Sequence, residues 1–148
     1  MQSMPINEIA AKLLTPESVS PVVASAARYM DNQDILHLHC VYIRRLCVST
    51  EAFAPFLSAG VLDMLCDAMA AQRACAQLQE VCLAAIWGLA FNKTHENIGS
   101  PMIFQRIFAA MAKHANLHVV QDAAFGALWH LSYHADNHAM IGSGTITA

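Results

Sequence analysis

The 148-residue sequence is poor in charge: Asp, Glu, Lys and Arg make up 13% of it, and the net charge is −3. No cluster of basic residues exceeds the pair Arg44 and Arg45. Because a phosphate backbone is bound by a basic face, we expect no nucleic acid as the main partner. No apolar run reaches the roughly 20 residues needed to cross a bilayer, so we also expect no membrane span.

The motifs of common catalytic sites are missing as well. The sequence contains no glycine-rich phosphate loop, no GxSxG turn, no HExxH and no CxxC. A Cys/His pair could be assembled in space from five cysteines and eight histidines, but nothing in the sequence selects one. We therefore expect a noncatalytic protein with no cofactor.

The five cysteines are odd in number and show no metal-ligand spacing. They are Cys40, Cys47, Cys66, Cys75 and Cys82. This pattern predicts reduced thiols that pack as small apolar residues in a reducing compartment. Residues 1–14 lack both a basic start and a long apolar run, which argues against a secretory signal. We expect a cytoplasmic protein, with the nucleus as the alternative.

The sequence does contain an internal repeat. Residues 78–92, LQEVCLAAIWGLAFN, match residues 120–134, VQDAAFGALWHLSYH, with a spacing of 42 residues from Trp87 to Trp129. Hydrophobic residues make up 56% of the chain, so each copy has a large apolar face to bury. A fixed spacing of this size is typical of helical repeat proteins, in which neighbouring units cover one another. We expect one all-α domain over residues 1–148.

Helical spacing of apolar residues divides the chain further. Besides the two matching stretches, it predicts helices over residues 5–14, 16–30, 34–48, 61–70 and 101–112. Gly60 fits a sharp corner before one of them, since glycine reaches positive φ freely. Ser100 and Pro101 are a helix start signal, a capping hydroxyl followed by a proline in the first turn.

Three-helix units with this period, together with the string ALWHLS and a following turn that contains Asn137, resemble armadillo repeats. The resemblance is strong over residues 49–134 and weaker before residue 49. It implies a right-handed α-solenoid of armadillo-like repeats with a period of about 42 residues. The implied units are residues 1–48, 49–92 and 93–134, with a partial repeat at 135–148.

The resemblance also implies a binding groove, because the third helices line the concave face of armadillo proteins. Residues four apart share a helix face. The exposed column then consists of Leu83, Trp87 and Phe91 in one repeat and of Phe125, Trp129 and Tyr133 in the next. In the first repeat it consists of Cys40, Arg44 and Val48, with one residue of slippage allowed in the connecting turn. Such a column suits an extended peptide or a partner helix. The alternative is that these rings pack between neighbouring repeats.

One feature of peptide-binding armadillo proteins is missing. In those proteins an asparagine four residues after the tryptophan binds the peptide backbone, whereas here Phe91 and Tyr133 take that place. Asn92 and His134 lie one position further on and point about 100° away on an ideal helix. This departure weakens any likeness to a nuclear-import receptor.

Histidines could form a different site. His130, His134 and His138 are spaced four apart and could meet a metal on one helical face, with Asp136 nearby. Against this, Asp136 and Asn137 look like a turn that ends the helix, and no cysteine lies close in sequence. We therefore assign no metal and interpret His130 and His134 as polar residues beside the groove.

The sequence thus predicts a protein-interaction module or scaffold whose groove binds a peptide or a helix of another protein. The alternative is a structural role, in which an open C-terminal repeat serves self-association or stacking in a longer array. A histidine-based metal site or hydrolase is a third hypothesis.

Overall fold

A computed structural model describes residues 16–47, 53–91 and 96–147, and all regular structure within them is helical. The helices are α2 (Pro16–Ala27), α3 (Gln33–Leu46), α4 (Phe53–Ser58), α5 (Val61–Ala71), α6 (Ala76–Ala90), α7 (Pro101–Lys113), α8 (His118–Leu131), the 3-10 helix η2 (Ala135–Asn137) and α9 (His138–Thr147). None of these is long and apolar enough to cross a membrane. The helix expected over residues 5–14 lies outside the described residues.

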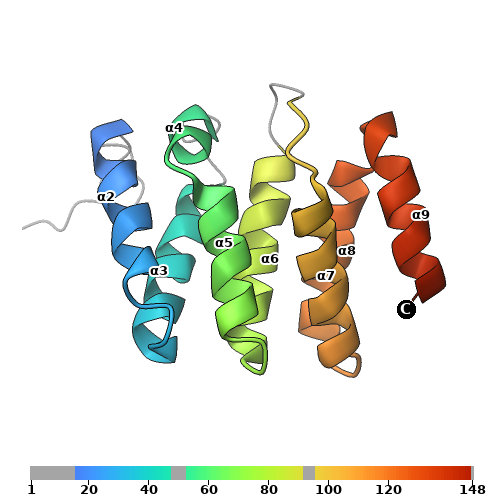
Figure 1. Cartoon of the computed structure of the whole chain (residues 1–148), viewed down its shortest axis with the longest axis horizontal. Coiled ribbons are helices and arrows are strands. Elements are labelled where there is room, and N and C mark those ends of the chain that lie inside the picture. The colour runs from blue at the N-terminus through green and yellow to red at the C-terminus, as the bar shows by residue number, and fades with distance from the viewer. Residues whose placement is uncertain (1–15, 48–52, 92–95, 148) are drawn as a thin grey trace, which may run out of the picture.

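The helices form two layers (Figure 1). α2, α5, α7 and α9 stand side by side in front, and α3, α6 and α8 lie behind them. α6 makes its most extensive contacts with α8 and α3, so the rear layer is a continuous row. The short α4 contacts α2 and α5. The all-helical arrangement is compatible with an α-solenoid.

Local signals placed two of these helices correctly. Gly60 precedes α5 with φ 79°, a left-handed conformation that glycine adopts without the steric cost of a Cβ. The side chain of Ser100 accepts a hydrogen bond of 3.3 Å from the backbone N–H of Ile103, and Pro101 is the first residue of α7. Both predicted helix starts are confirmed.

Two glutamines, Gln79 and Gln121, make equivalent side-chain hydrogen bonds in the two matching stretches. Gln79 is buried at the start of α6, and its Nε2 donates to the carbonyls of Met69 and Gln72, each at 3.0 Å. Forty-two residues later, Gln121 donates to the two equivalent carbonyls at 3.0 and 3.1 Å. Each glutamine thereby satisfies carbonyls at the end of the preceding helix, which have no partner inside that helix.

The rear helices α3, α6 and α8 also begin at nearly equal intervals along the chain. α6 begins 43 residues after α3, and α8 begins 42 residues after α6. With that one extra residue, Ile43 corresponds to the equally buried Ile86, and Arg44 corresponds to Trp87. The structure therefore contains the one-residue offset that the alignment of Arg44 with Trp87 requires.

Candidate functional site

Aromatic side chains gather on α6 and in and just after α8. Trp87, Phe91, Phe125, Trp129 and Tyr133 are all exposed, from 40% for Trp87 to 71% for Tyr133. We call these five residues the aromatic surface. Scattered exposed apolar side chains are ordinary, but a contiguous apolar patch is typical of an interaction site.

His130 joins the rings of the two helices. Its ring centroid lies 4.9 Å from that of Phe91, 5.7 Å from that of Tyr133 and 6.3 Å from that of Trp87. Its Nδ1 donates to the carbonyl of Gly126 at 3.0 Å, which fixes the ring against α8. Because Nδ1 carries that proton, Nε2 is the acceptor nitrogen of the neutral ring.

The two tryptophans have different environments. The ring of Trp87 lies against Gly126 of α8: a Cβ on Gly126 would come within 2.5 Å of Cδ2 of that ring. Trp129 is 66% exposed, and its Nε1 donates to the hydroxyl of Tyr133 at 2.8 Å. Trp87 therefore both packs between helices and reaches the surface, whereas Trp129 is mainly a surface residue.

Leu83 does not belong to the exposed column, and that prediction is corrected. Its side chain is fully buried, although its counterpart Phe125 is 60% exposed. The reason is the neighbouring helix: α8 packs extensively on α6, whereas within the described residues no further rear helix packs on α8. Cys40, the equivalent residue of α3, is buried as well.

The remaining predicted site residues lie outside the aromatic surface or outside the described residues. Arg44 is exposed on α3, so the column continues there with a cation instead of a ring. His134 is half-buried at the start of η2 and makes no side-chain cap. Asn92 and Val48 lie outside the described residues.

Sequence reasoning missed the role of Gly126. A glycine inside a helix costs about 1 kcal/mol relative to alanine, so its presence in the middle of α8 is a usable signal of close approach. The structure shows that the ring of Trp87 makes that approach.

Two of the three histidines of the alternative metal site, His130 and His138, are bonded to the backbone. His138 Nε2 donates to the carbonyl of Ser132 at 2.7 Å, and His130 binds the carbonyl of Gly126. Over residues 16–47, 53–91 and 96–147 no group of three His, Cys, Asp or Glu side chains could hold a metal ion.

Three of the five cysteines, Cys47, Cys66 and Cys82, have raised pKa values and are unsuited to nucleophilic chemistry at neutral pH. Burial raises the pKa of Cys47 to about 12. Burial also raises the pKa of Cys66 to about 11, although the nearby Arg106 guanidinium opposes this. The hydrogen bond to Cys40, 3.6 Å between the sulfur atoms, and then burial raise the pKa of Cys82 well above its usual value. All five cysteines are free thiols, and only Cys75 is not buried.

We expect a thiol reagent such as DTNB to modify one of the five thiols quickly at pH 8, because the thiolate is the reactive form and four of the side chains are buried. The other four should react only when urea unfolds the protein. The released chromophore counts the thiols, and Cys75→Ser should remove the fast phase. Rapid reaction of more than one thiol in the native protein would contradict the packing described above.

Comparison of the chain with protein-family models, curated proteins and solved structures finds no match. The aromatic surface is the main feature from which a function can be inferred. Its rings come from two adjacent helices, and the His130 ring lies close to rings from both of them.

Proposed function

We propose that this chain is a noncatalytic protein-binding module, built as a right-handed α-solenoid of armadillo-like repeats, and that the aromatic surface is its binding site. The observation that carries the proposal is the exposure of five large rings on adjacent helices. Tryptophan and tyrosine dominate the binding energy of many protein interfaces. The five free thiols fit a reducing compartment, the cytoplasm or the nucleus.

The size of the surface is adequate for binding. Covering one ring such as Trp129 removes on the order of 100 Å² from water, which contributes about 2.5 kcal/mol. Association costs roughly 4–15 kcal/mol in lost freedom of motion. A single ring is therefore not enough, whereas five rings together contribute about 12 kcal/mol by the same estimate.

The chemistry of the surface favours a helix as the partner over an extended peptide. Phe91 and Tyr133 stand where peptide-binding armadillo grooves carry asparagines, so those positions offer no side-chain amide to a peptide backbone. The Tyr133 hydroxyl already accepts the indole N–H of Trp129. A helix satisfies its backbone groups internally and presents an apolar face, which is what this surface can cover.

The proposal is tested with the double variant Phe125→Ala/Trp129→Ala. Both side chains are largely exposed, so we expect unchanged helical circular dichroism and at least about tenfold weaker capture of the native partner. Leu38→Ala is the matched control, because Leu38 is 67% exposed on α3, outside the aromatic surface. Capture that is equally strong in the double variant would reject the site, and loss of helicity would show that the rings support the fold.

Phe125 favours a second candidate function, stacking by a second copy of the chain or by further repeats. Its counterpart Leu83 is buried on α6, against which α8 packs. Phe125 occupies the equivalent position of α8, so a further helix packed on α8 would cover it in the same way. Sedimentation velocity over a 100-fold concentration range tests self-association. A monomer at every concentration would reject it, and Phe125→Asp should abolish any association observed.

A further inference from the structure

An open groove lies between α2 and α5, which stand side by side in the front layer (Figure 1). Its volume is about 300 Å³, and most of the side chains that line it are apolar. α2 contributes Ala24 and Ala27, and α5 contributes Asp63, Met64 and Asp67. We call the space between these residues the α2–α5 groove.

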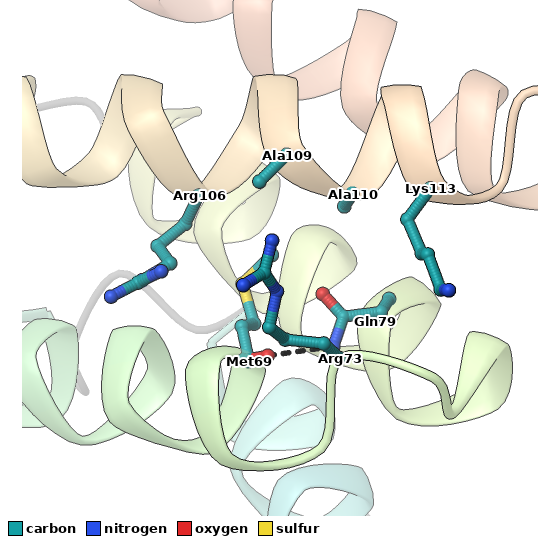
Figure 2. A pocket seen from close by; sticks show the side chains of 7 residues that line it. All are labelled: Met69, Arg73, Gln79, Arg106, Ala109, Ala110 and Lys113. Atoms are coloured by element: carbon teal, nitrogen blue, oxygen red, sulfur yellow. Dashed lines mark hydrogen bonds between the residues drawn. The ribbon is translucent and has the colours of Figure 1, made fainter.

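The next groove of the front layer, between α5 and α7, is nearly filled and has a volume of about 10 Å³ (Figure 2). Met69, which lines the filled groove, stands 42 residues after Ala27 of the open one. In the same way, Arg106 stands 42 residues after Met64. The two grooves are therefore equivalent positions of the repeat. Because alanine has no side chain beyond Cβ, the α2–α5 groove keeps space that a methionine occupies one repeat later.

The α2–α5 groove is anionic, since Asp63 and Asp67 line it and no Lys or Arg does. Both side chains are exposed, and in the part of the chain that the structure describes neither carboxylate makes an ion pair or a hydrogen bond. The helix dipole favours Asp63 in the first turn of α5, whereas Asp67 lies one turn further on. Like charges at this spacing destabilise a helix slightly, so the stability of α5 does not explain the pair.

We propose that the α2–α5 groove binds an amphipathic helix of a partner protein that carries Lys or Arg residues four positions apart. The lining residues of α5 extend from Gly60 to Asp67, which is about 10 Å or two helical turns. Cations four residues apart on a helix match the spacing of Asp63 and Asp67, because both pairs are separated by one turn. The aliphatic parts of Lys and Arg side chains cover apolar surface while their charged ends stay at the rim. The short side chains of Ala24 and Ala27 let the partner helix approach closely.

The α2–α5 groove belongs to the front layer and shares no residue with the aromatic surface of the rear layer, so this proposal does not depend on the proposed function (Figure 1). The probe is a fluorescein-labelled model helix with alanine and leucine on one face and two lysines four residues apart. A matched peptide carries glutamine in place of both lysines. Fluorescence anisotropy measures the binding of each peptide to the full chain.

We expect the wild type to bind the lysine peptide at least about tenfold more tightly than the glutamine peptide. Asp63→Asn/Asp67→Asn removes both charges with little change of shape, and it should weaken binding of the lysine peptide at least about tenfold. The control Asp122→Asn/Asp136→Asn removes two exposed carboxylates elsewhere and should bind like the wild type. Equal binding of the two peptides, or an equal effect of the two double variants, would overturn the proposal.

Ala27→Met tests the shape of the groove without changing its charge. It introduces the side chain that occupies the equivalent position of the filled groove, and Ala27 is exposed. We expect at least about tenfold weaker binding of the lysine peptide with unchanged helical circular dichroism. Phe125→Ala/Trp129→Ala should leave this binding unchanged. Loss of binding in that variant, with full binding by Ala27→Met, would assign the peptide to the aromatic surface and overturn the proposal.

Discussion

Replacing Gly126 with leucine is expected to lower the free energy of unfolding by about 3 kcal/mol, because overpacking a filled interface forces side chains and backbone to move. Even a Cβ at this position would lie 2.5 Å from Cδ2 of Trp87. Because α6 is packed against α3 and α8 on its two sides, the ring can move only outward, which breaks its contact with α8. Urea unfolding followed by circular dichroism measures the loss.

Gly142→Leu is the control for this prediction. A Cβ at Gly142 in α9 would meet nothing within 4 Å, so the same substitution should be neutral or stabilising there, as expected when glycine is replaced in a helix. In a Trp129→Phe background, the emission of Trp87 should also shift to the red in Gly126→Leu. Unchanged stability and emission would mean that Trp87 does not pack on Gly126.

Asn137→Ala is expected to cost about 3 kcal/mol, because it removes several buried hydrogen bonds at once. Asn137 is fully buried, and its Nδ2 donates to the carbonyl of Leu131 at 2.7 Å and to Oδ1 of Asn97 at 2.9 Å. Its Oδ1 accepts from Nδ2 of Asn97 at 3.1 Å. The substitution leaves the end of α8 and Asn97 without these partners.

Thermal and urea unfolding measure this effect as well. Gln105→Ala, on the exposed side of α7, should change stability by less than about 0.5 kcal/mol and serves as the control. Equal stability of the Asn137 and Gln105 variants would show that the Asn97–Asn137 hydrogen bonds do not stabilise the turn between α8 and α9.

The sequence predicted the elements that depend on local chemistry. Apolar spacing located α3, α6 and α8, and the signals at Gly60 and Ser100 located the starts of α5 and α7. These features depend on residues close in the chain, so one sequence is enough to find them. The likeness to armadillo repeats and the right-handed winding stay predictions.

The sequence could not tell Leu83 from Phe125. Both occupy the same position in the repeat, and helical spacing gives them the same face. Their burial differs because α8 covers one of them, which is a property of the neighbouring helix and not of the local pattern. Periodicity identifies a face, but the next element in space decides whether that face is exposed.

The approach of Arg73 to α7 was missed for a related reason. Arg73 follows α5, and its side chain reaches toward α7, which carries Arg106 (Figure 2). The two arginines are far apart in the chain, so a search for basic clusters along the sequence finds only Arg44 and Arg45. Their approach depends on the packing of α5 beside α7.

Site-specific photo-crosslinking shows whether the aromatic surface contacts a partner protein. A benzoylphenylalanine placed at Phe125 puts the reactive group on the aromatic surface, and one placed at Leu38 puts it at an equally exposed apolar position of α3. We predict a crosslink to a partner protein from position 125, which is lost when Trp129→Ala is added, and no crosslink from position 38. A crosslink from position 38 alone, or equal crosslinking from both positions, would contradict it.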